Sequence, residues 1–194
     1  VRNQIRKSEK SGLVTRKVNA EGLESFYAIV ARNMRDLGSP VHSLRFFREI
    51  LSSFGSAASV YLVSRDDGTS VAGAISVRFS DCVSVPWASS LRSARPACPN
   101  HALYWGILRD ALEGGAEELD FGRSSSGTGT FHFKKQWKTR AEPLIWRSYN
   151  DQGTPEPESA WNPDRHAFLV DVWRRIPVPL ANWVGPWLRR QIPN

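Results

Sequence analysis

Two segments in the first third of the chain carry apolar residues at the spacing of one helical face. In residues 20–38 these positions are Leu23, Phe26, Ile29, Val30 and Met34. They recur every three or four residues, and Gly38 followed by Pro40 can end the helix. Residues 43–54 repeat the pattern. The sequence therefore predicts two successive helices, preceded by a short strand at 12–18.

Three strand-like runs follow, at 59–65, 71–80 and 82–88. They are rich in Val, Ser and aromatic residues, and Asp-Gly or a lone Asp separates each from the next. Such short connections join neighbouring antiparallel strands. We therefore expect an antiparallel meander, in which Pro86 distorts the third strand or places it at an edge.

The second half of the chain predicts alternating helices and strands. After a loop at 89–100, the expected elements are a helix at 101–116, a strand at 117–123, a glycine-rich turn and short helix at 127–137, a strand at 143–149, and helices near 163–175 and 180–191. Residues 151–160 contain Pro and acidic residues, which is typical of a linker. The chain is thus divided into an α+β domain at 1–150, a linker at 151–160, and a Trp- and Arg-rich helical tail at 161–194.

Composition narrows the class of protein. The chain has 194 residues, of which 41% are hydrophobic and 23% charged, as in one globular domain with an appended segment. No run of about 18 apolar residues indicates a transmembrane helix. Cys82 and Cys98 are too few for a disulfide scaffold or a zinc site, so we expect no metal. The chain begins with Val1, and its first residues lack the apolar segment of a signal peptide. We therefore expect a piece of a longer protein with a cytoplasmic location, either free or membrane-peripheral.

The net charge of +7 is concentrated in blocks. Residues 1–20 hold six Lys or Arg against one Glu, residues 121–150 hold six against one, and residues 161–194 hold five Arg against two Asp. The middle block mixes cations with Gly, Ser, Thr and aromatic residues, which favours binding of phosphates. A solvated basic face is the alternative.

The stretch 103–137 contains LDFGRS at 119–124, GTG at 127–129 and FKKQW at 133–137. With these motifs it resembles the FemAB-like proteins of the GNAT superfamily. Residues 31–51 and 162–190 are similar to segments of the FemAB-like proteins that accompany exosortase and PEP-CTERM systems. The resemblance implies a GNAT-like fold, with a mixed, mostly antiparallel sheet flanked by helices. It also implies that this chain corresponds to the second of two tandem GNAT-like modules.

The resemblance further implies an N-acyltransferase of cell-envelope or exopolysaccharide metabolism. FemAB-type enzymes of peptidoglycan synthesis transfer an amino acid from aminoacyl-tRNA to an amine, and a Phe-Lys pair lies at their active site. That pair matches Phe133-Lys134. The co-substrate would be aminoacyl-tRNA or acyl-CoA, with no tightly bound cofactor. Acetyl-CoA-dependent GNAT enzymes hold pyrophosphate with a glycine-containing loop, whereas residues 89–100 contain no glycine, and this difference favours aminoacyl-tRNA.

The chemistry of acyl transfer assigns candidate roles to residues of this stretch. Lys134 can stabilise the developing negative charge, with Phe133 packing against the substrate and His132 as a candidate base. The remaining candidate substrate-binding residues are Tyr104, Asp120, Arg123, Ser124, Gly127, Thr128, Gly129 and Lys135. Arg123 can grip an anion in bidentate fashion, and the loop 124–130 can bind anions through backbone N–H groups.

Each of these assignments has a structural alternative. Lys134 could be solvated with Phe133 in the core, Arg123 could pair with an acidic residue of its own strand, and the loop could be a flexible connector. His132 could be an ordinary surface residue. Asp120 could act as a base or orient Arg123.

Two other functions fit the same sequence. One is a non-catalytic module that binds tRNA, polysaccharide phosphate or another anion; the other is an acetyl-CoA-dependent acetyltransferase of a small amine. The tail also has two interpretations. Its residues Trp161, Trp173, Trp183 and Trp187 could lie on an anionic membrane together with arginines, or they could pack across the sheet.

Overall fold

A computed structural model describes residues 1–145, 147–149, 155–156 and 167–190. Its centre is a five-stranded sheet in the order β1-β2-β3-β4-β5. The strands are β1 (Val14–Lys17), β2 (Ala58–Ser64), β3 (Ser70–Phe79), β4 (Cys82–Ser90) and β5 (Glu118–Asp120). Strands β1 to β4 pair antiparallel, and β5 pairs parallel to β4. The expected α+β class, mixed sheet and antiparallel meander are confirmed.

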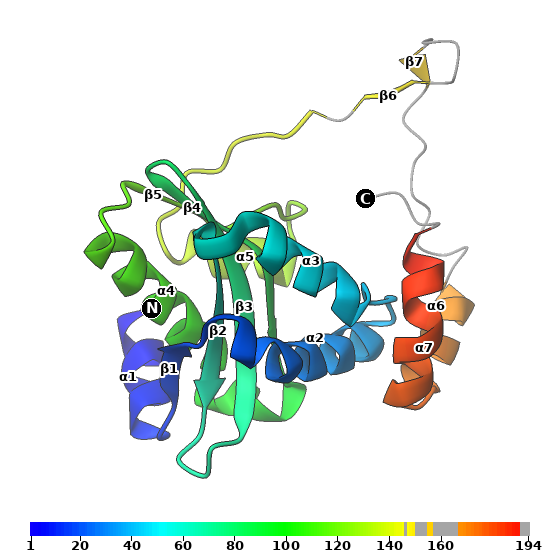
Figure 1. Cartoon of the computed structure of the whole chain (residues 1–194), viewed down its shortest axis with the longest axis horizontal. Coiled ribbons are helices and arrows are strands. Elements are labelled where there is room, and N and C mark those ends of the chain that lie inside the picture. The colour runs from blue at the N-terminus through cyan, green and yellow to red at the C-terminus, as the bar shows by residue number, and fades with distance from the viewer. Residues whose placement is uncertain (146, 150–154, 157–166, 191–194) are drawn as a thin grey trace.

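Helices cover both faces of this sheet (Figure 1). They are α1 (Arg2–Lys10), α2 (Leu23–Leu37), α3 (Leu44–Phe54), α4 (Pro99–Glu113) and α5 (Gly129–Lys135), with 3-10 helices η1 (Asn19–Gly22), η2 (Gly55–Ala57) and η3 (Arg92–Ala97). Strand side chains alternate between faces. Phe26 and Phe47 of α2 and α3 therefore share one core with Ile75, while Leu103 and Ile107 of α4 form the other.

Strand β4 departs from regular pairing near Pro86. Ile75 lies opposite Trp87, but Val77 lies opposite Ser84. Between these pairs β4 holds one residue more than β3, which makes a β-bulge. Pro86 falls inside the bulge, where its missing N–H removes no ladder hydrogen bond. The distortion expected at Pro86 is confirmed.

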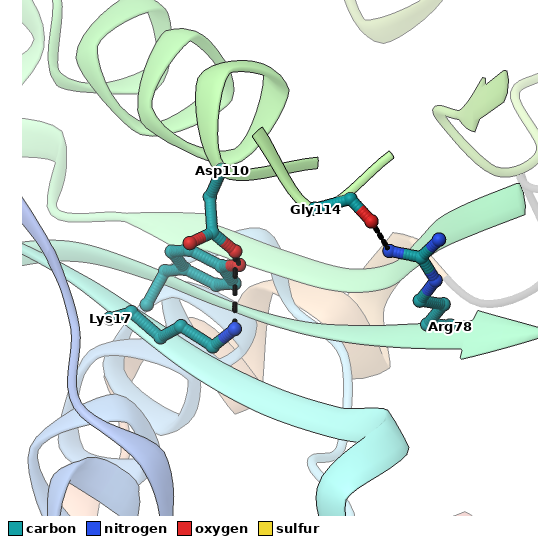
Figure 2. A network of polar contacts seen from close by, with 5 residues as sticks. Lys17, Arg78, Asp110 and Gly114 are labelled. Atoms are coloured by element: carbon teal, nitrogen blue, oxygen red, sulfur yellow. Dashed lines mark hydrogen bonds and ion pairs between the residues drawn. The ribbon is translucent and has the colours of Figure 1, made fainter. Parts of the chain in front are cut away.

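A polar cluster fastens the C-terminal end of α4 to the sheet (Figure 2). Lys17 Nζ on β1 lies 3.2 Å from Asp110 Oδ2 on α4, and the buried hydroxyl of Tyr61 on β2 donates to the same carboxylate. Arg78 on β3 donates to the carbonyl oxygen of Gly114 at 2.6 Å. These residues line a cavity of about 180 Å³. The cluster joins three strands to α4.

The tail helices α6 (Ala167–Arg175) and α7 (Val178–Arg189) pack against α2, at the end away from α1 and α4 (Figure 1). The backbones approach closely there. A Cβ on Gly38, which ends α2 with φ 83°, would collide with the Val170 side chain, and one on Gly185 would lie 3.3 Å from the Val41 nitrogen. The two expected tail helices are therefore confirmed. In the described part of the chain, no helix combines the length and apolarity needed to cross a bilayer.

The strand expected at 143–149 is wrong for most of its length. Among the described residues of this range, only β6 (Ser148–Tyr149) is a strand, and it pairs with β7 (Pro155–Glu156) in a separate two-stranded sheet. Leu144 and Ile145 are exposed, so the apolar run that suggested a strand has no sheet to pack on. Most of the expected linker lies outside the described residues.

Helix α1 was not expected from the sequence. Ile5 is its only large apolar residue, so its sequence has no helical period to detect. The helix packs beside α4, and this tertiary contact compensates for the missing amphipathic pattern.

Candidate functional site

Strands β4 and β5 pair over three residues and then separate. The paired segments are Cys82–Ser84 and Glu118–Asp120, after which the chain turns at Gly122 with φ 71°. A Cβ on Gly122 would lie 3.3 Å from the Val85 carbonyl oxygen and 4.0 Å from Lys134 Nζ. Within the described chain no strand lies beside the β4 edge after Val85. The nitrogen of Lys134 therefore lies where the two strands diverge.

Two backbone carbonyls hold Lys134 in this position. Its Nζ donates to the oxygens of Gly122 and Arg123, each at 2.8 Å. Since an ammonium group has three N–H donors, one remains for a substrate. Burial lowers the pKa of Lys134, and the charge of Asp120 acts in the opposite direction. Carbonyl oxygens carry no net charge, so the ammonium is oriented without being neutralised.

Asp120 and Thr128 fix the loop that supplies these carbonyls. Asp120 Oδ1 accepts from the Gly122 N–H at 2.7 Å, and Oδ2 accepts from Ser84 Oγ at 3.4 Å. Thr128 Oγ1 accepts from the Phe131 N–H at 3.2 Å and so caps α5. These hydrogen bonds hold the loop at both ends. Asp120 and Thr128 therefore each have a structural role.

An aromatic cluster supports α5 on the side of the core. The ring of Tyr104 on α4 stacks on Phe121 at 4.8 Å between centroids and meets Phe133 at 5.3 Å. Trp137 closes the cluster 6.3 Å from Phe133. Burial, and to a lesser extent the charge of Asp120, raises the pKa of Tyr104 to about 12. Tyr104 therefore remains a neutral packing residue, while Phe133 is only half-buried.

Other candidate residues lie on the outer side of this region. His132 is exposed and its ring meets Phe131 at 5.9 Å. Residues two apart on a helix point in different directions, so His132 does not share the face of Lys134. Lys135 lies over the Phe131 ring, 5.7 Å from its centroid. Arg123, Gly127 and Gly129 are exposed, and Ser124 Oγ is buried without a hydrogen-bond partner among the described residues.

The structure thus brings together only part of the predicted set. Lys134, Asp120, Tyr104 and Phe133 converge around the turn at Gly122, whereas His132 and Lys135 lie apart from the ammonium group. A second cavity, of about 250 Å³, lies between α2, η3 and α6. It is lined by Asn33, Asp36, Leu37, Arg92, Arg95 and Arg174. Neither this cavity nor the one near Lys17 is lined by Lys134.

Two residues near this site, Ser84 and His101, were not expected from the sequence. Ser84 reaches Asp120 across 36 positions, and only the parallel pairing of β4 with β5 could have indicated this contact. His101 on α4 is half-buried, with its ring 5.1 Å from Phe133, and burial lowers its pKa. Among the described residues, no group of three or more His, Cys, Asp or Glu could hold a metal ion.

Comparison with known proteins identifies the family. Residues 1–135 match the acetyltransferase (GNAT) domain family, which is more than half of the chain. The chain therefore belongs to the GNAT acetyltransferase domain family. No curated protein matches it.

Solved structures share the fold at low sequence identity. FemX superposes with a TM-score of 0.65 at 17% identity, over 70% of this chain and 52% of FemX. An aminoglycoside acetyltransferase from an uncultured soil metagenomic sample, in complex with sisomicin, gives 0.58 at 12%, over 73% and 97%. The ribosomal-protein-S18-alanine N-acetyltransferase from Escherichia coli gives 0.57 at 14%, over 74% and 88%. The chain spans about half the length of FemX, and these likenesses show the GNAT fold.

Proposed function

We propose that this chain is a FemAB-like N-acyltransferase module, which transfers an aminoacyl or acyl group to an amine. The observation that carries this proposal is the Lys134 ammonium, held by two carbonyls at the divergence of β4 and β5. Membership of the GNAT family supports the reaction class. The likeness of the fold to FemX is in keeping with a FemAB-like module.

In the reaction, the acceptor nitrogen attacks the acyl carbon and the carbonyl oxygen becomes an oxyanion. The oriented ammonium of Lys134 would donate its remaining N–H to that oxyanion, or to the oxygen or sulfur that leaves. Collapse of the intermediate breaks the bond to the leaving group, and the nitrogen releases a proton. Asp120 would keep Lys134 charged and hold Gly122 in place, while Phe133 would contact the substrate with its exposed part.

The proton released by the amine needs an acceptor. His132 is exposed on the outer side of α5, so it would accept this proton only through solvent. We therefore expect His132→Ala to change transfer by no more than about twofold, which is far less than a general base contributes. A loss of 100-fold would return the base role to His132.

Two acyl donors are candidates within this proposal, aminoacyl-tRNA and acyl-CoA. Arg92 and Arg95 lie exposed on η3, after β4, and can contact phosphates of either donor, with Arg123 and the loop 124–130 as further candidates. Acyl-CoA is the second candidate donor. A structurally similar aminoglycoside acetyltransferase was solved with a bisubstrate analogue of CoA. That enzyme is 14% identical to this chain, with a TM-score of 0.55 over 71% of this chain and 98% of the enzyme.

Several finer features belong to the same proposal. We place the transferase domain at 1–150 and the helical tail at 161–194, with a preceding GNAT-like module in the full protein, in keeping with the half-length match to FemX. A cytoplasmic site acting on a cell-envelope, peptidoglycan or exopolysaccharide precursor would follow from the FemAB relationship. Assignment to the exosortase-associated branch rests on the sequence resemblance alone.

The test is a transfer assay with radiolabelled aminoacyl-tRNA or acetyl-CoA and a panel of amine acceptors. Lys134→Ala is expected to abolish transfer with little change in the thermal midpoint, while Lys135→Ala serves as the matched neighbour and stays active. Full activity of Lys134→Ala would refute the assignment. Absence of transfer with every donor, together with RNA binding that weakens steeply with salt, would favour the non-catalytic binding module.

A further inference from the structure

The outer side of the tail helices is apolar although it faces solvent. Six large apolar side chains of α6 and α7 are exposed: Phe168, Leu169, Val172, Leu180, Trp183 and Trp187. Trp183 is 80% exposed and Phe168 is 77% exposed. Trp183 and Trp187 are four residues apart on α7, so they project from the same side of the helix. A concentration of large exposed apolar side chains on two successive helices is characteristic of an interaction site.

This outer side is distinct from the side that holds the tail to the domain. Val170 contacts the turn at Gly38, and Gly185 lies against Val41. Ala181 and Gly185 are buried. The inner contacts therefore already account for how α6 and α7 attach to α2. One interpretation of the sequence is that the tail tryptophans pack across the sheet. Trp183 and Trp187 do not pack in this way, because both are exposed.

The charges around this surface indicate the chemistry of its partner. Arg175 and Arg190 are exposed at the C-terminal ends of α6 and α7. Arg174 is paired with Asp171 at 3.2 Å, and Arg189 contacts His42. Asp171 is the only acidic residue of the two helices. An apolar surface edged by arginines and containing tryptophans matches the interface of a bilayer with anionic lipids.

We propose that α6 and α7 bind the surface of an anionic lipid bilayer, with the six exposed apolar side chains in the headgroup region and Arg175 and Arg190 near lipid phosphates. The helices have nine and twelve residues, too short to span about 30 Å of hydrocarbon, so they lie in the plane of the interface. This surface is outside the residues matched to the acetyltransferase family. The proposal is therefore independent of the reaction at Lys134.

The test uses the full chain with vesicles of phosphatidylcholine alone or mixed with phosphatidylglycerol, measured by flotation. The chain should bind the mixed vesicles, and Trp183→Ser combined with Trp187→Ser should weaken binding at least about tenfold. Arg175→Glu with Arg190→Glu should weaken binding to the mixed vesicles by about 30-fold or more. Phe79→Ser, which changes an 85% exposed side chain on β3, and Arg45→Glu on α3 are the matched controls and should bind normally.

Folding and self-association are measured on the same samples. Thermal midpoints should agree between the intact chain and the variants, because the changed side chains are exposed. Quenching of tryptophan fluorescence by brominated lipids should occur in the intact chain and decrease in the double tryptophan variant. Equal flotation of the intact chain and this variant would overturn the proposal. A dimer in sedimentation equilibrium that the variant loses, without vesicle binding, would instead identify a second copy as the partner.

Discussion

The two edges of the sheet each hold a lysine, and the two lysines differ in what holds them. Lys17 on β1 lies 3.2 Å from the Asp110 carboxylate, so its charge is compensated within the fold. Lys134, beside β5, contacts two uncharged carbonyls instead. Among the described residues, no carboxylate lies within ion-pair distance of Lys134. Only the second lysine therefore keeps a charge that an anionic substrate can neutralise.

The difference also explains which lysine is adapted to chemistry. Desolvation disfavours a charged group, and at Lys134 it lowers the pKa. Asp120 offsets part of this cost from a distance. Because no carboxylate forms a direct ion pair with Lys134 in the described part of the chain, the rest of the compensation is left to a ligand or a transition state. At the opposite edge, the Lys17 contact and the Tyr61 hydroxyl satisfy Asp110. That cluster fastens α4 to the sheet, and we expect it to affect stability rather than transfer.

The largest expected effect is on transfer by Lys134→Gln. The glutamine amide is neutral and shorter, so it cannot present the same charge to a developing oxyanion. The turnover number should fall by about 100- to 1000-fold, as when an oxyanion donor is removed. Single-turnover kinetics with a labelled donor measure it, with the donor KM recorded separately. A variant that changed KM alone would show that Lys134 binds the ground state rather than the transition state.

The reciprocal change is Asp110→Ala, and its effect should be on stability. The variant removes the carboxylate partner of the hydroxyl of Tyr61, a residue that is 4% exposed overall. It also leaves Lys17 without its ion pair. A buried donor that loses its partner costs about 1–3 kcal/mol. Urea denaturation measures the loss, and Glu113→Ala, at an exposed neighbour on α4, is the control. If the variant unfolded like the intact chain but lost transfer, the Asp110 edge rather than the Lys134 edge would be the one that supports the reaction.

A third test changes the charge beside Lys134 and follows transfer against pH. Lys134 is charged below its pKa, which lies under the ordinary lysine value of 10.5, so transfer should fall as pH rises through that pKa. Asp120→Asn removes the charge that favours the ammonium form, while the amide oxygen can still accept from Gly122. The pKa should then decrease further, and the alkaline fall in transfer should move to lower pH.

The corresponding stability effect has a definite sign. The unfolded chain holds the Lys134 proton more tightly than the folded one, so stability rises with pH between the two pKa values. Lys134→Gln should abolish that rise. Glu118→Gln, which removes a carboxylate from the same strand β5, is the control for Asp120→Asn. If the alkaline fall in transfer occurred at the same pH in Asp120→Asn as in the intact chain, Asp120 would have no influence on the charge of Lys134.

Much of the fold could be predicted because its elements have periodic patterns. The apolar spacing of α2 and the short apolar runs of β2 and β3 depend only on neighbouring residues. Helix α1 has a single large apolar residue, Ile5, and its stability comes from contact with α4. Conversely, the run at 143–149 has a strand-like composition but no partner in the main sheet. Local pattern fails wherever a tertiary contact decides the outcome.

The candidate site divides in the same way. Phe133-Lys134 could be located because the motif is continuous in sequence. The carbonyls that bind Lys134 could not, since their position depends on the turn at Gly122 with φ 71°. The contact of Lys17 with Asp110 joins residues 93 positions apart, and neither carries a local signal. His132 was a candidate through its place next to the pair, but adjacent and alternate residues of a helix face different sides.

The smallest expected effect is that of Lys17→Gln. The side chains of Lys17 and Asp110 are 44% and 39% exposed, so solvent screens their attraction and the pair contributes about 0.5 kcal/mol. Asp110 retains the Tyr61 hydroxyl as a donor, so no buried group is orphaned. Urea denaturation should show this small loss, and transfer should equal that of the intact chain. A loss as large as that of Asp110→Ala would mean that the lysine, rather than the tyrosine contact, fastens α4 to this edge.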